Sequence, residues 1–128
     1  MSKSPSPRIR KVNGLIKEIV AGAVAELTDP ELGFVTITGV DCSPDLRRAI
    51  VFFSPLGSEK QRKASGDALE RATKRVQADV ARQVRMKFTP VIEFAVDISV
   101  ENGMRITQLL SEIESQEDAE AATDDVAR

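Results

Sequence analysis

The chain has 128 residues, of which 41% are hydrophobic, and it contains one cysteine and no histidine, tryptophan or tyrosine. This length is enough for the core of one domain but hardly for two. The lack of histidine removes the commonest proton shuttle and the commonest transition-metal ligand, and with them most catalytic constellations. We therefore expect a protein that is not an enzyme and that has no metal or cofactor.

Two further features predict where the protein resides. The sequence has no run of about 18 apolar residues that could cross a membrane, and its first residues, MSKSPSPR, lack the apolar stretch of a signal peptide. Cys42 cannot form an internal disulfide, and it has no histidine to activate it as a nucleophile. These features predict a cytoplasmic protein with a buried, structural thiol.

The net charge of −2 conceals a separation of charge along the chain. Residues 112–128 hold seven acids and one base, a balance of −6, so residues 1–111 carry +4. The acidic segment has too few apolar residues to fold, and we predict a disordered tail there. Residues 1–7, rich in Ser, Pro and Lys, are predicted to be a disordered arm, which leaves residues 8–111 as the folded domain.

Two long helices are predicted from apolar residues at steps of three and four. The first runs from Arg8 to about Thr28 and stops at Asp29-Pro30, because the residue before a proline is pushed out of the α region. The second covers residues 58–86 and ends before Thr89-Pro90. A short third helix is predicted over residues 100–113.

Three strands are predicted from β-branched and alternating segments. Residues 34–40 form the first, with Val35 on one face and Val40 on the other, and a turn of Ser, Pro and Asp leads to a second strand over 48–53. This short link predicts an antiparallel hairpin. The third strand, over 91–98, follows the long helix, so it joins the sheet by a crossover in parallel with the second, and the helices lie on one face.

Basic residues gather on one face of the long predicted helix. At 100° per residue they fall opposite the apolar stripe that contains Val76 and Val80. The basic residues are Arg71, Lys74, Arg75, Arg82 and Arg85, with Lys87 just beyond. One interpretation is an ordinary solvated face. However, only Asp79 interrupts the run between positions 71 and 87, and such clustering is what neutralising a phosphate backbone requires, so we predict contact with nucleic acid.

A second basic cluster and the aromatic residues refine this prediction. Arg8, Arg10 and Lys11 open the first helix, either as a solvated terminus or as a further nucleic-acid contact. All five aromatics are phenylalanines, and four of them fall in predicted strands, where core packing is favoured over stacking on bases. The five are Phe34, Phe52, Phe53, Phe88 and Phe94. Recognition through the backbone and shape of the nucleic acid is therefore expected.

Residues 29–57, DPELGFVTITGVDCSPDLRRAIVFFSPLG, resemble the signature stretch of the ribosome-binding factor A family. The similarity continues in order through residues 68–72 and 103–106, and it covers about residues 8–111. The resemblance implies an α+β, type II KH-like domain in the order α-β-β-α-α-β. In this fold a kink splits the long helix, and a three-stranded sheet carries its helices on one face.

The resemblance also implies a function. Members of this family bind the small (30S) ribosomal subunit and its 16S rRNA without catalysis, assist late maturation of the 5′ region of that rRNA, and matter most in the cold. For this chain it implies the small subunit and 16S rRNA as partners. A cytoplasmic monomer is expected, with no membrane, small-molecule substrate or cofactor.

One departure from the family pattern concerns the kink. Family members carry Ala-x-Gly there, whereas the matching residues are Ala72, Thr73 and Lys74. Because only glycine enters unusual backbone regions cheaply, the lysine predicts a milder kink, or one helped by the β-branched Thr73. Lys74 also adds a positive charge where RNA is expected to pass.

Three other functions compete with the maturation factor. A KH-like module for mRNA or another ribonucleoprotein would bind naked RNA without ribosomal subunits. A protein-binding adaptor would use the sheet or the acidic tail, and its binding would not depend on salt. An enzyme ranks last, because acids such as Glu93 and Asp97 have no visible mechanistic partners.

Overall fold

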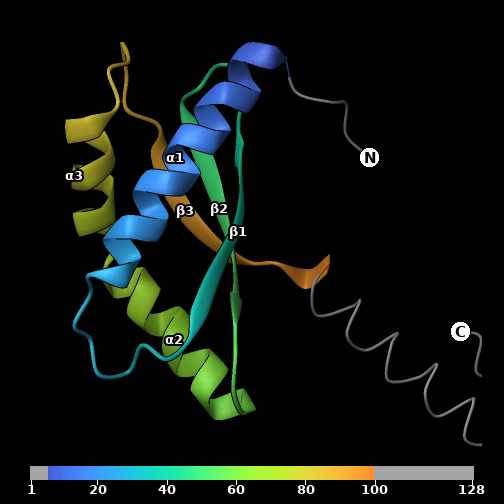
Figure 1. Cartoon of the computed structure of the whole chain (residues 1–128), viewed down its shortest axis with the longest axis vertical. Helices are drawn as coiled ribbons and strands as arrows, with labels where there is room; N and C mark the ends of the chain where they lie inside the picture. The colour runs from blue at the N-terminus through green and yellow to red at the C-terminus, as the bar shows by residue number, and fades with distance from the viewer. Residues whose placement is uncertain (1–5, 100–128) are drawn as a thin grey trace, which may run out of the picture. The chain divides into compact units, whose positions relative to one another are not determined.

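The structure, a computed structural model, describes residues 6–99, and Figure 1 shows how their helices and strands are arranged. The elements are α1 (Pro7–Ala25), β1 (Val35–Cys42), β2 (Arg48–Pro55), α2 (Glu59–Arg71), α3 (Thr73–Gln83) and β3 (Val91–Val96). All six belong to one compact unit, which ends at Val96. Within the described part of the chain, no helix is both long and apolar enough to cross a membrane. The short helix predicted over 100–113, most of the N-terminal arm and the acidic tail lie outside the described residues.

Helix α1 is fixed at both ends by local hydrogen bonds. The hydroxyl of Ser6 caps its start by accepting from the backbone N–H of Ile9 at 3.2 Å, and Pro7 stands at a first-turn position where no N–H is needed. The helix ends at Ala25, three residues before the end predicted at Thr28. There the N–H of Glu26 turns back to the carbonyl of residue 23 at 3.2 Å, which tightens the last turn and stops α-helical bonding.

The three strands form one sheet in the order β1-β2-β3. Strands β1 and β2 pair antiparallel, and β2 and β3 pair parallel, so the predicted hairpin and crossover are confirmed. Figure 1 shows α1 and α3 side by side on one face of this sheet, and α1 packs on β1 while α3 packs on β3. The α+β fold expected from the resemblance, with helices on one face, is confirmed.

A β-bulge corrects the predicted faces of β1. The pairing shifts between Ile37 and Gly39, so two residues of β1 oppose one residue of β2. Beyond the bulge the alternation is displaced by one residue, and Val40 pairs with the fully buried Val51. The prediction that Val35 and Val40 lie on opposite faces is therefore wrong, because both contribute to the core.

The continuous helix predicted over 58–86 is wrong, and the kinked pair implied by the resemblance is right. The chain leaves the helical path at Ala72, whose φ of −89° and ψ of 0° separate α2 from α3. The hydroxyl of Thr73 donates to the carbonyl of Leu69 at 3.1 Å and supports this break, as expected for a β-branched residue there. Lys74 lies inside α3, and Leu46 is the only non-glycine with positive φ among residues 6–99, so the break needs no glycine.

The core lies between the helices and the sheet. Most of the largest fully buried side chains come from α1, α2, α3 and β2, and they include Ile16, Val20, Leu69, Val76, Val80 and Val51. Among the phenylalanines, Phe53 is 3% exposed and meets Phe94 edge to face at 6.2 Å between ring centroids. Phe34 is 81% exposed and precedes β1, so its assignment to a strand and to the core is wrong.

Cys42 is buried at the end of β1, as predicted, and its backbone N–H donates to the side-chain carbonyl of Asn13 in α1 at 2.9 Å. Burial raises the pKa of the Cys42 thiol to about 11, with a smaller contribution from Asp41. A rise from 9.0 to about 11 lowers the thiolate population at neutral pH by about a hundredfold. We expect a disulfide reagent to react at least that much more slowly with native than with denatured protein; equal rates would show that the thiol is accessible.

Candidate nucleic-acid interface

The exposed side of α3 carries three of the predicted basic residues. Lys74, Arg75 and Arg82 lie on the side opposite the buried Val76 and Val80, as helical geometry requires for residues at these spacings. Their side chains are exposed. This part of the predicted stripe exists in the fold.

Two of the predicted basic residues form ion pairs with acidic side chains. The guanidinium of Arg71, at the end of α2, contacts Asp29 in the loop after α1 at 2.9 Å, and Arg82 pairs with Asp79 one turn away. The pKa of Asp29 is lowered first by the N–H of Glu31, which donates to it at 2.9 Å, and then by Arg71. Both pairs reduce the positive charge that these arginines present to a ligand.

Lys74 and Arg75 are the cations of α3 that are not in an ion pair within the described part of the chain. Within residues 6–99 neither side chain forms an ion pair or a hydrogen bond. Lys74 also borders a groove of about 620 Å³ between the α2–α3 break and β3, which it shares with Glu70 and Phe94. The strongest free positive charge of α3 therefore lies at its first turn, directly after Ala72.

Arg85 and Lys87 are not on the helix face where the sequence pattern places them. Val84 adopts an extended conformation, with φ −110° and ψ 122°, and α3 ends at Gln83. The two basic residues follow in the loop that leads to β3, and the structure brings this loop close to Arg8 at the start of α1. Arg10 and Lys11 are exposed on α1 but do not line this region.

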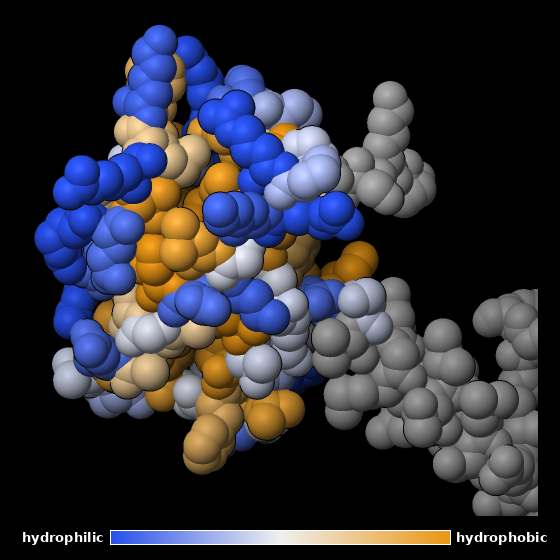
Figure 2. All heavy atoms as spheres, turned by 45° about the horizontal axis from the view of Figure 1, so that its top comes forward, coloured by the Kyte–Doolittle hydropathy of each residue, from blue (hydrophilic) through white to orange (hydrophobic). Residues whose placement is uncertain are grey.

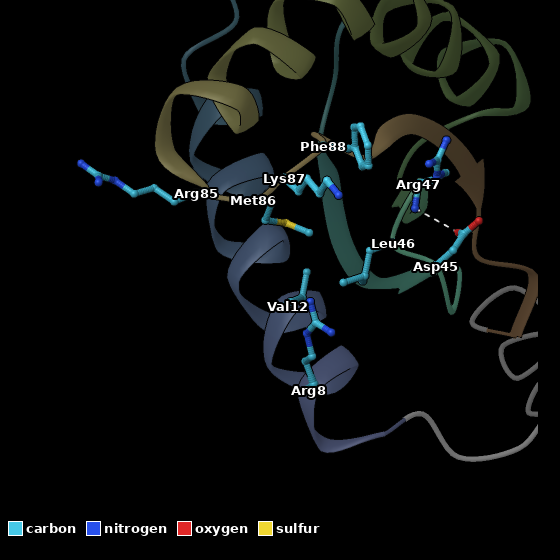
Figure 3. A pocket seen from close by; sticks show the side chains of 9 residues that line it. All are labelled: Arg8, Val12, Asp45, Leu46, Arg47, Arg85, Met86, Lys87 and Phe88. Carbon is cyan, nitrogen blue, oxygen red and sulfur yellow. Dashed lines mark hydrogen bonds between the residues drawn. The ribbon is translucent and has the colours of Figure 1, made fainter.

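The loop after α3, the start of α1 and the turn between β1 and β2 line an open pocket of about 550 Å³ (Figure 3). Its lining residues are Arg8, Val12, Asp45, Leu46, Arg47, Arg85, Met86, Lys87 and Phe88. In Figure 3 the side chain of Arg85 points away from the other residues, whereas Lys87 and Phe88 turn toward Arg47. Figure 2, tilted to bring the top of Figure 1 forward, shows hydrophilic side chains around an apolar area.

Arg47 and Phe88 are residues of this surface that sequence reasoning missed. The guanidinium carbon of Arg47 lies 4.6 Å from the centroid of the Phe88 ring, a cation–π contact between the hairpin turn and the loop before β3. Arg47 lies between the predicted turn of Ser43, Pro44 and Asp45 and the strand predicted from Arg48, so its exposure could be anticipated. The contact of Arg47 with Phe88 could not be anticipated, because the two residues are 41 positions apart in the sequence and only the folded chain brings them together.

Comparisons with known proteins identify the family. The sequence profile described as ribosome-binding factor A matches residues 8–110. The chain belongs to the ribosome-binding factor A family. Its relatives include the ribosome-binding factor A of Geobacter metallireducens, 40% identical over 111 residues, which cover 86% of this chain and 94% of the relative. The ribosome-binding factor A of Geobacter sulfurreducens is 38% identical over 110 residues, which cover 85% of this chain and 93% of the relative.

Solved structures of related proteins agree with the fold. The crystal structure of ribosome-binding factor A from Thermus thermophilus has a TM-score of 0.62 at 30% identity and covers 69% of this chain and 93% of its own. The solution structure of a Thermotoga maritima protein has a TM-score of 0.65 at 31% identity. The match covers 73% of this chain and 91% of the Thermotoga maritima chain. A homology model of the Thermus thermophilus factor, as fitted into the cryo-EM map of a 30S complex with it, has a TM-score of 0.55 at 31% identity. The match covers 65% of this chain and 88% of that one.

Proposed function

We propose that this chain binds the small (30S) ribosomal subunit and assists the late maturation and processing of the 5′ region of 16S rRNA, without catalysis. Membership of a ribosome-binding family carries the proposal, together with the Thermus thermophilus relative whose coordinates were fitted into a map of a 30S complex. Under this proposal the protein acts as a cytoplasmic monomer and is needed most in the cold.

The proposed RNA contacts are the basic residues of α3 and of the surfaces beside it. They are Arg71, Lys74, Arg75, Arg82, Arg85, Lys87, Arg8, Arg10 and Lys11. Lys74 and Arg75 are the principal contacts, because neither is in an ion pair within the described residues, whereas Arg71 and Arg82 share their charge with Asp29 and Asp79. Ala72 and Thr73 form the break that places this pair at the start of a new helix.

Phosphate contact predicts a binding reaction that depends strongly on salt. Each cation that neutralises a phosphate releases condensed counterions, so affinity falls as salt rises. A factor that must leave the mature subunit needs this moderate, reversible affinity. A protein-binding adaptor that uses apolar surface would show a much weaker salt dependence.

The proposal is tested by sedimenting the purified full chain with small subunits, large subunits and whole ribosomes over a series of salt concentrations. We expect the protein to pellet with small subunits, not with large ones, and to be released as salt rises. Binding to naked mRNA with no preference for small subunits would instead support a general KH-like module. Binding to small subunits that is insensitive to salt would contradict the phosphate contacts.

A further inference from the structure

The pocket shown in Figure 3 lies apart from the exposed side of α3 and combines three segments that are distant in sequence. The start of α1 contributes Arg8, the hairpin turn contributes Arg47, and the loop after α3 contributes Lys87 and Phe88. None of these segments forms the pocket alone. Its chemistry therefore belongs to the folded domain and not to a local motif.

The floor of the pocket is apolar. It consists of Val12 from α1, Leu46 from the hairpin turn and Met86 from the loop. Leu46 is 8% exposed, and its φ of 59° holds it in a left-handed conformation that is uncommon for a branched residue. The N–H of Leu46 donates to the carbonyl of Ser43 at 2.8 Å, so the turn is closed and the floor is fixed in place.

The rim of the pocket is basic, with Arg8, Arg47 and Lys87 against a single acid, Asp45, while the side chain of Arg85 points away (Figure 3). Asp45 is occupied by its own turn, since its carboxylate accepts from the hydroxyl of Ser43 at 2.7 Å and from the backbone N–H of Arg47 at 3.1 Å. These bonds, the hydroxyl first, lower its pKa. The acid stabilises the turn, and the surrounding cations remain available to an anionic ligand.

One wall of the pocket is formed by the ring of Phe88 and the two cations beside it. Phe88 is 48% exposed, the Arg47 guanidinium lies 4.6 Å from its ring centroid, and the Lys87 ammonium lies 5.6 Å from it. An exposed aromatic ring bordered by guanidinium and ammonium groups suits a ligand that is planar, apolar on its faces and attached to negative charge. An unpaired nucleotide in RNA has all three properties, and pockets of some hundreds of Å³ are the usual size for such a group.

We propose that this pocket binds one unpaired nucleotide of the RNA that the protein recognises. The base lies against the Arg47–Phe88 stack and the apolar floor, and Arg8 and Lys87 hold its flanking phosphates. The inference rests on the proposed function for the choice of RNA as partner, and it adds a contact to a single-stranded element that the basic side of α3 does not require. A base inside an A-form duplex has no free face and would not enter.

The test uses the full chain and a short single-stranded RNA with 2-aminopurine at its centre and fluorescein at its 5′ end. The protein has no tryptophan, so the 2-aminopurine signal reports base stacking, while the fluorescein anisotropy reports total binding. We expect wild-type protein to quench the 2-aminopurine, and Phe88→Leu to weaken the quenched complex by about tenfold, the effect of losing one stacked base. Arg47→Lys, which keeps the charge but not the planar group, should also reduce quenching.

Phe34→Leu is the matched control, because Phe34 is 81% exposed and does not line this pocket. It should bind and quench like wild type, and circular dichroism should show that all variants are folded. Equal quenching by Phe88→Leu and wild type would overturn the pocket. So would RNA binding with no quenching, or a hairpin RNA or acidic peptide that competes as well as the single strand. In these cases unchanged sedimentation of Phe88→Leu with small subunits would leave the proposed function standing.

Discussion

Replacing Lys74 and Arg75 together by Glu is expected to weaken binding to small subunits by about a hundredfold at near-physiological salt. These two residues are the exposed cations of α3 that form no ion pair within the described chain. Each phosphate contact contributes roughly five- to tenfold to affinity at about 0.1 M salt, and reversing the charge adds repulsion to the lost attraction. The measurement is sedimentation with small subunits over a salt series, in which the slope of log affinity against log salt should fall by about two.

A matched control separates local contacts from net charge. Lys17→Glu with Lys60→Glu changes the charge of the protein by the same amount, and both lysines are exposed on other helices. We expect this variant to keep most of the affinity, because screening weakens charges that lie more than about 10 Å from the RNA. If both double variants lose affinity equally, net charge and not the exposed side of α3 determines binding.

Leu69→Ala is expected to lower the free energy of unfolding by about 3 to 4 kcal/mol, the cost of a cavity at a fully buried leucine. Leu69 lies near the end of α2 and packs in the core that joins the helices to the sheet. The total free energy of unfolding of a native domain is about 5 to 15 kcal/mol, so the variant would lose a large part of its stability. Urea denaturation followed by circular dichroism measures the change.

The control for this prediction is Leu15→Ala in α1, where the leucine is 44% exposed. It should change the stability by about 0.5 kcal/mol or less, as surface substitutions do. A loss at Leu69 no larger than the loss at Leu15 would mean that the core does not depend on the end of α2.

Periodicity predicted most of the fold because the core is continuous and the helices are amphipathic. Apolar residues at steps of three and four predicted α1, and the alternation of apolar and polar residues predicted the hairpin, because each of these elements packs on one face. The bulge in β1 could not be found in this way, since Val40 faces the core only after a shift in pairing with β2. The break at Ala72 was also hidden, because the apolar stripe continues from Leu69 to Val76 across it. It was found by the family resemblance.

The candidate site was harder to predict than the fold, because the sequence shows which residues are basic but not which of them form ion pairs with acids in the folded chain. Arg71 belongs to the predicted stripe, but it contacts Asp29, which lies 42 positions earlier. The same limit hid the stack of Arg47 on Phe88, which needs both the hairpin turn and the loop before β3 in place. Sequence reasoning identified the sign and approximate position of the charge, and the fold decides which cations remain uncompensated.

The break at Ala72 also has a cost for folding. A helix that begins at Thr73 has its positive dipole end there, where acidic residues are favoured and basic ones oppose the dipole. The first turn of α3 contains no acid and no side-chain cap, and it carries Lys74 and Arg75. By contrast, Arg71 lies at the end of α2, where a cation is favourable. The two cations at this helix start therefore oppose its dipole, and under the proposed function their attraction to phosphates is the gain that offsets this loss of folding stability.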